Sequence, residues 1–173
     1  MGWAAKIRPA TTGDAAAISR LILSLARFFT VDPGGRGAED FLLSLQPDAV
    51  AARLASASFK TWVAVADGSD VAGVIVVRGG HHIFHLFVAE AFQAQGGARA
   101  LWRHVLPHLP PGARVTVNAT LFAHGFYERM GFVATGPAVQ TAGIAFIPMA
   151  WRCHGEGGGG SSTGNPAPPH GPH

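Results

Sequence analysis

Cysteine and acidic residues are scarce in this chain, and both shortages narrow the classes of protein to which it can belong. The 173 residues contain one cysteine, Cys153, so no disulfide can form within the chain, as is typical of a reducing cytoplasm. Only 10 residues are acidic against 13 lysines and arginines, which gives a net charge of +3 with neutral histidines. The arginines are dispersed rather than massed in one tract, so we expect no nucleic-acid partner.

Long apolar runs and export signals are also missing. No apolar run reaches the roughly 20 residues that cross a bilayer, and the N-terminus lacks a basic start followed by an apolar core. We therefore expect a cytoplasmic protein with no membrane partner. Hydrophobic residues still make up 48% of the chain, which suits one domain with a single core.

The end of the chain differs in composition from the rest. Residues 154–173 are rich in glycine, proline and histidine and contain no large apolar side chain. We predict a disordered tail over 154–173 and one domain over 1–153, and we interpret the tail histidines as solvated residues rather than metal ligands.

Apolar residues repeat with two different periods along 1–153, and together they predict an α+β fold. Asp14 and Asp48 are suited to cap the first two helices. Residues of high β propensity predict strands over 4–10, 61–66, 71–78, 81–88, 114–119, 132–135 and 144–151. Helical spacing predicts helices over 14–29, 48–54, 98–106 and 123–130. We expect a mixed, mostly antiparallel sheet of about seven strands flanked by about four helices.

An apolar strand runs through a loop of small residues directly into a helix near the middle of the chain. The strand ends at residues 86–88, and Gly96, Gly97 and Ala98 lead into the helix. The first turn of a helix has unpaired N–H groups and a partial positive charge, so small residues there let a diphosphate approach closely. Arg99 can add positive charge. A Gly-x-Gly-x-x-Gly dinucleotide site is disfavoured, because Gln93 holds the first position and strand 114–119 has no acidic residue.

These motifs resemble a known family. Gln93-x-x-Gly96-x-Ala98 is similar to the Gln/Arg-x-x-Gly-x-Gly/Ala signature of GCN5-related N-acetyltransferases (GNAT), and the strand over 86–88 precedes it at that family's spacing. A second family segment is also present, with Asn118, Ala123, Tyr127 and Gly131-Phe132 in order. The resemblance covers about Ile7 to Trp151.

The resemblance implies a GNAT-like fold, acetyl-CoA as cosubstrate and no metal. In such proteins coenzyme A lies in a gap beside the strand that precedes the loop, and the Val88 N–H would polarise the thioester oxygen. The residues implied for coenzyme A binding are Leu86, Phe87, Val88, Gln93, Ala94, Gln95, Gly96, Gly97, Ala98, Arg99 and Asn118.

Tyr127, the only tyrosine, is the candidate general acid. A phenol with an ordinary pKa of about 10 stays protonated at neutral pH and can return a proton to a leaving thiolate. Apolar neighbours on its helix, Phe126 and Met130 among them, equally suit a packed core tyrosine. The family segment around Tyr127 favours the catalytic role.

His82 is the candidate base, because its distance from Gln93 matches a catalytic glutamate or histidine in members of the family; ordered water is the alternative. Strand alternation puts His82, Phe84, Leu86 and Val88 on one face and His81, Ile83, His85 and Phe87 on the other. His81 and His85 would lie about 13 Å apart along the strand, too far to share one metal ion. Cys153 has no base near it in sequence, so we interpret it as incidental.

The sequence therefore predicts an acetyl-CoA-dependent N-acetyltransferase that joins acetyl-CoA and a primary amine in a ternary complex. The acceptor is a small-molecule or protein amine, and the lack of a carboxylate cluster makes a polyamine a weaker alternative. The family resemblance also allows a homodimer. A coenzyme A-binding regulatory module without turnover and an acyltransferase for a longer acyl group remain open alternatives.

Overall fold

The computed structural model describes residues 3–67 and 70–152. Cys153 and the predicted tail over 154–173 lie outside the described residues. The fold is α+β, and among the described helices none is long and apolar enough to cross a membrane. The helices are α1 (Ala15–Ser24), α2 (Glu39–Leu43), α3 (Pro47–Ala55), α4 (Gly97–Val105) and α5 (His124–Arg129). The strands are β1 (Lys6–Pro9), β2 (Phe59–Val65), β3 (Val71–Arg78), β4 (His82–Val88), β5 (Arg114–Thr120), β6 (Val133–Ala134), β7 (Val139–Thr141) and β8 (Ile144–Arg152).

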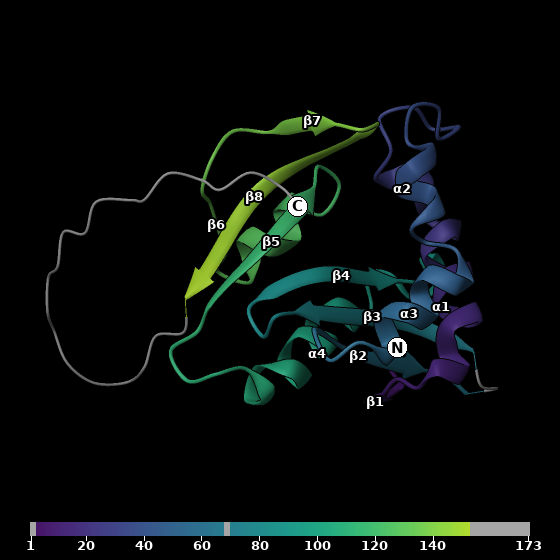
Figure 1. The fold of residues 1–173 in the computed structure, drawn as a ribbon. Helices are drawn as coiled ribbons and strands as arrows, with labels where there is room; N and C mark the ends of the chain where they lie inside the picture. Colours follow the sequence, from purple (N-terminus) through teal and green to yellow (C-terminus); the bar gives the residue numbers. More distant parts are fainter. Residues whose placement is uncertain (1–2, 68–69, 153–173) are drawn as a thin grey trace, which may run out of the picture.

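One mixed sheet contains all eight strands. Its order is β1-β2-β3-β4-β5-β8-β6, and β7 also pairs with β8. Every described pairing is antiparallel except that of β4 with β5, which is parallel and covers two residue pairs, His82 with Thr116 and Ile83 with Val117. Figure 1 shows β5 and β8 swinging away from β4 beyond this short contact. The predicted α+β fold is confirmed.

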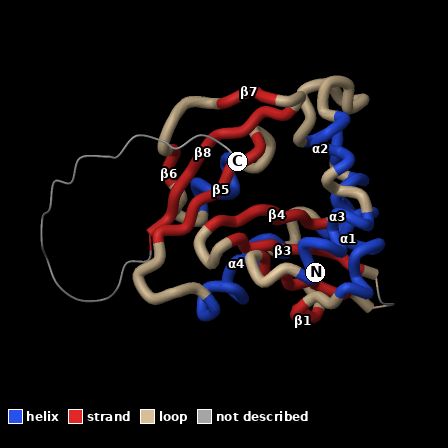
Figure 2. The backbone as a smooth tube through the Cα atoms, viewed as in Figure 1, coloured by secondary structure: helices blue, strands red, loops and turns tan. Residues whose placement is uncertain are grey.

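Helices cover the sheet on both sides, and the path of the backbone can be followed in Figure 2. On one side, α1 and α3 bury a cluster that includes Ile18, Ile22 and Val74. On the other, α4 and α5 bury a second cluster that includes Leu101, Trp102 and Tyr127. The predicted apolar face of α4 is thus confirmed, with Leu101 and Val105 fully buried.

The entry to α1 is more elaborate than the predicted cap. Thr11 begins a capping box on a 3-10 turn (Thr12–Asp14), and the Asp14 carboxylate accepts a 2.8 Å hydrogen bond from the Thr11 N–H. The two terminal guanidinium nitrogens of Arg8, Nη1 and Nη2, also donate to the Asp14 carboxylate, each at 2.9 Å. The hydrogen bonds from Arg8, and to a smaller extent the bond from Thr11, lower the pKa of Asp14 to about 2. The predicted cap at Asp48 is wrong, because Gln46 is the N-cap of α3 and Pro47 occupies its first turn.

Three local features differ from the predicted elements. The first helix ends at Ser24, and a 3-10 turn, η2 (Ala26–Phe28), follows it. The short helix α2 and the strand β7 were not predicted; β7 is exposed along its whole length, so it lacks a half-buried apolar pattern.

A bulge in β4 overturns the predicted alternation of its side chains. Ile83 pairs with Val77 and His85 pairs with Val76, which leaves Phe84 as an extra residue. Phe84 therefore packs with the α1 cluster, whereas Leu86 packs with the α4 cluster. Strict alternation had placed these two residues on one face.

Candidate active site

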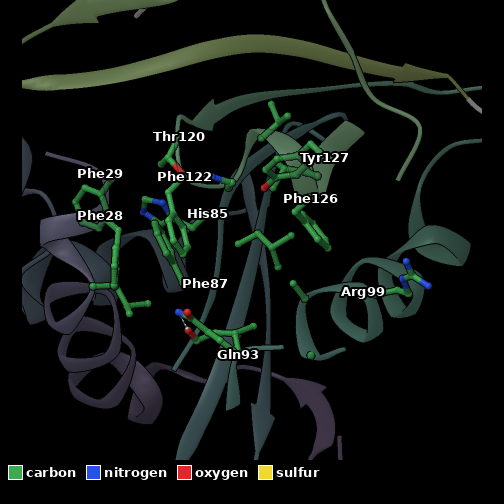
Figure 3. A pocket seen from close by; sticks show the side chains of 18 of the residues that line it. Phe28, Phe29, His85, Phe87, Gln93, Arg99, Thr120, Phe122, Phe126 and Tyr127 are labelled. Atoms are coloured by element: carbon green, nitrogen blue, oxygen red, sulfur yellow. Dashed lines mark hydrogen bonds between the residues drawn. The ribbon is translucent and has the colours of Figure 1, made fainter. Parts of the chain in front are cut away.

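A cavity of about 660 Å³ opens where β4 and β5 part. Beyond Ile83 and Val117 the two strands no longer pair, so their facing backbone edges make no sheet hydrogen bonds with each other. Side chains from η2, β4, the loop after β4, α4, β5 and α5 line the space. Figure 3 shows Phe28 and Phe29 at one side of it, Tyr127 and Phe126 across from them, and Gln93 and Arg99 near the loop and α4.

The backbone of β4 presents hydrogen-bonding groups to this cavity. The Ala89 N–H donates to the carbonyl of Ala72, a residue of the neighbouring strand β3, at 2.8 Å. Because successive N–H groups of a strand point in opposite directions, the Val88 N–H points away from β3 and into the gap. The Val88 carbonyl points the same way and accepts a 3.1 Å hydrogen bond from the Gln93 side-chain amide. Gln93 therefore ties the loop to the free edge of β4.

Two consecutive glycines shape the loop for different physical reasons. Gly96 is the N-cap of α4 with φ of 83°, a backbone conformation that side chains disfavour, and a Cβ there would meet nothing within 4 Å. A Cβ at Gly97 would lie 2.5 Å from the Trp3 ring. The packing of Trp3 therefore requires a glycine at position 97, whether or not a ligand also approaches it as the sequence suggested. The open space lies at Gly96.

Positive charge and helix geometry coincide at this end of the cavity. The N–H groups of Gly97, Ala98 and Arg99 belong to the first turn of α4, where they have no carbonyl of the same helix to bind. Arg99 and Arg129 are the only permanently charged side chains among the described residues that line the cavity. An anion such as a diphosphate fits this arrangement.

Tyr127 combines a buried ring with access to the cavity. Its side chain is 5% exposed, and its ring packs edge-on against Phe126 and Phe132, with centroids 5.2 Å away in each case. Figure 3 shows its hydroxyl turned toward the cavity. Burial raises the pKa of Tyr127, so the phenol stays protonated through the neutral range.

The two histidines of β4 occupy different environments. His82 does not line the cavity; its Nδ1 lies 2.8 Å from the Thr116 hydroxyl, and burial, with charge from Arg78 and His81, lowers its pKa to about 4. His85 does line the cavity, and its Nε2 is buried without a hydrogen-bond partner in the described protein. Burial, with charge from Arg53, lowers the pKa of His85 to about 3, so its imidazole is neutral at pH 7.

Most of the predicted site residues come together around this cavity. Of those implied for coenzyme A binding, all except Gln95 line it; the Gln95 amide donates instead to the Ala91 carbonyl at 3.2 Å. Four further residues line the cavity that we did not predict for the site: His85, Thr120, Phe122 and Arg129. Arg129 follows Phe126 by three positions and so shares its helix face, a signal that could have found it.

The chain belongs to the GNAT acetyltransferase family. The family described as the acetyltransferase (GNAT) domain matches residues 29–153, which confirms the resemblance noted in the sequence. Over 76 residues the chain is 38% identical to the peptidyl-lysine N-acetyltransferase YjaB of Salmonella typhimurium, a match covering 43% of this chain and 51% of YjaB. The chain thus spans about half the length of this curated relative.

Solved structures share the fold. A GCN5-related N-acetyltransferase from Rhodopseudomonas palustris aligns with a TM-score of 0.66 at 21% identity, over 88% of this chain and 98% of that one. PaiA N-acetyltransferase from Thermoplasma acidophilum, solved in complex with coenzyme A, aligns with a TM-score of 0.63 at 14% identity, over 85% and 98% of the two chains.

Proposed function

We propose that this protein transfers the acetyl group of acetyl-CoA to a primary amine while both are bound, without an acyl-enzyme intermediate. The observation that supports this most is the parting of β4 and β5 beside the first turn of α4. It leaves a free strand edge, an anion-binding helix start and the Tyr127 hydroxyl around one cavity.

Different groups around the cavity suit successive parts of the acetyl-CoA molecule, from the diphosphate to the thioester. The first-turn N–H groups of α4 bind the diphosphate, with Arg99 and Arg129 adding charge. The free edge of β4 from Leu86 to Val88 binds the pantetheine arm. Gln93, Ala94 and Asn118 complete the walls, and the Val88 N–H donates to the thioester oxygen, where negative charge develops during the reaction.

Tyr127 acts on the leaving group in this proposal. The amine nitrogen attacks the thioester carbonyl carbon, a C–N bond forms, and the C–S bond breaks with its electron pair on sulfur. The Tyr127 phenol donates its proton to that sulfur and regains one from solvent. Water takes the proton that the amine nitrogen loses. His82 remains a predicted base, but it hydrogen bonds with Thr116 and lies outside the cavity lining.

The acceptor is a small-molecule or protein amine. YjaB, the partial relative, is named for transfer to peptidyl-lysine, which supports a protein amine as one acceptor type. A coenzyme A-binding module without turnover would need the same loop but would make no use of the Tyr127 hydroxyl.

Measuring thiol release from acetyl-CoA across a panel of amines tests the proposal. We expect release with at least one amine, and we expect Tyr127→Phe to lower kcat about 100-fold while acetyl-CoA binds with unchanged affinity by calorimetry. Tight binding with no thiol release for any amine would instead support the module. Faster release from longer acyl-CoAs would reassign the acyl group.

A further inference from the structure

The side of the cavity across from Tyr127 is lined by a segment spanning residues 25–31 (Figure 3). Phe28 stacks on Phe122 of the β5–α5 loop, with ring centroids 4.7 Å apart. On one side Arg27 pairs with Glu90, which follows β4. On the other, the Val31 N–H donates to the Gly143 carbonyl of the β7–β8 hairpin at 2.8 Å. We call residues 25–31 the cover; contacts to three separate elements hold it in place on this side.

Aromatic rings dominate the walls under the cover. Phe28 and Phe29 line the cavity from the cover itself, Phe87 from β4 and Phe122 from the β5–α5 loop (Figure 3). Phe29 and Phe87 contact each other with centroids 5.4 Å apart. Flat apolar rings bind other rings well through stacked and edge-on contacts. The walls therefore suit an acceptor that is itself a small ring.

No described residue that lines the cavity carries a negative charge to compensate an ammonium ion. Among the described residues that line the cavity there is no carboxylate, and both permanently charged ones, Arg99 and Arg129, are positive. A ring face can attract a cation, but such a contact is weak beside a carboxylate, and the Arg27 guanidinium already lies 4.4 Å from the Phe28 centroid. Glu90 at the rim pairs with that same arginine. A buried, unpaired ammonium would be strongly disfavoured here.

The described lining also offers no base that could neutralise an alkylammonium. Of the described histidines only His85 lines the cavity, and burial keeps its pKa far below that of an amine. An alkylammonium with a pKa near 10.4 is only about one part in a thousand neutral at pH 7. An arylamine needs no such help, because its nitrogen lone pair is delocalised into the ring and the molecule is neutral at pH 7.

We propose that the acceptor is a small arylamine, held under the cover against the rings of Phe28, Phe29, Phe87 and Phe122. This inference rests on the proposed acetyltransferase function. The uncharged aryl nitrogen attacks the thioester carbonyl, the C–S bond breaks, water takes the nitrogen's proton, and Tyr127 protonates the thiolate. The products are an N-acetylarylamine and coenzyme A.

A pair of isomeric amines provides the test, because 4-methylaniline and benzylamine have the same atoms and the same ring but differ in basicity. With the full chain and acetyl-CoA, thiol release is measured from pH 6 to pH 9. We expect kcat/KM for 4-methylaniline to exceed that for benzylamine at least tenfold at pH 7. We also expect the ratio to narrow as pH rises, since only benzylamine gains neutral form over this range. Equal or better use of benzylamine at pH 7 overturns the inference.

Spermidine and a lysine peptide separate this inference from the proposed function. Transfer to either of them without transfer to 4-methylaniline overturns the arylamine assignment and leaves the acetyltransferase function intact. No thiol release with any amine overturns both.

Two neighbouring variants locate the acceptor. Phe122 and Leu121 are 63% and 57% exposed, so both tolerate truncation, but only Phe122 lines the cavity. We expect Phe122→Ala to raise the KM for 4-methylaniline about tenfold and Leu121→Ala to leave it unchanged. Equal effects of the two substitutions would overturn the placement under the cover.

Discussion

The side-chain amide of Gln93 donates a 3.1 Å hydrogen bond to the carbonyl oxygen of Val88. This bond fixes the loop against the strand edge whose Val88 N–H faces the cavity. Gln93→Glu is nearly isosteric but sets a carboxylate against that carbonyl oxygen and adds negative charge near the loop. We expect calorimetry to show about tenfold weaker acetyl-CoA binding.

Gln93→Met serves as the uncharged control for this substitution. It removes the donor at similar volume, which corresponds to about 1 kcal/mol, or roughly a fivefold loss of affinity. An unchanged affinity in the glutamate variant would show that the bond does not shape the binding site.

Gly96 offers a test of the phosphate site that separates charge from backbone strain. Gly112, in the loop before β5, also has a positive φ, 70°, and space for a Cβ, but it does not line the cavity. Glu at either position introduces the same strain and the same charge. We expect Gly96→Glu to weaken acetyl-CoA binding at least tenfold and Gly112→Glu to change only the melting temperature. Matching affinities in the two variants would argue against a diphosphate at Gly96.

The Arg8–Asp14 pair makes stability depend on acid pH. The pKa of Asp14 is lowered to about 2 in the folded state, so its ion pair is complete above the unfolded pKa near 3.9 and is lost as pH falls through both values. We expect Asp14→Asn to lower the free energy of unfolding by about 1 kcal/mol at pH 7. As pH falls from 4 toward 2 the difference between the two proteins should shrink. A difference that is constant with pH in urea titrations would contradict an ionic origin.

His85 makes the free energy of unfolding depend on pH in a separate, higher range. Its pKa is lowered to about 3, so between pH 6.5 and about 3 the unfolded chain binds a proton that the folded state excludes. Stability therefore falls as pH decreases through this window, by up to about 1.4 kcal/mol per pH unit. His82, with a pKa of about 4, adds a similar slope above that pH.

Substituting His85 isolates its share of this slope. We expect His85→Phe to reduce the decrease in unfolding free energy between pH 6 and pH 4, whatever it does to stability at pH 7. The slope, and not the absolute stability, is the readout in denaturant titrations. A variant with the wild-type slope would show that His85 takes up a proton in the folded state.

Features that depend on short stretches of the chain could be predicted from the sequence. The apolar stripe of α4, the glycine at its start and the antiparallel run of β2, β3 and β4 all follow from local periodicity and turn residues. The loop and Tyr127 were placed in one site because two family segments stood in order. The structure brings Gln93, Gly96 and Tyr127 around one cavity, as those segments implied.

Features that depend on distant contacts could not be predicted. The bulge at Phe84 arises from the pairing of β4 with β3, and His85 rather than His82 lines the cavity. The strand β7 exists only because β8 supplies its partner edge. The aromatic walls under the cover bring together Phe28, Phe87 and Phe122, which no local pattern connects.

The packing of Trp3 on Gly97 links the start of the described chain to the loop before α4. The ring of Trp3 lies against Gly97 and meets Phe92 edge-on with centroids 6.0 Å apart, so the start of the chain supports both ends of the loop. Contacts between such distant positions close a long stretch of chain. The final shape of the loop therefore depends on the docking of residues near the start of the chain as well as on the loop's own sequence.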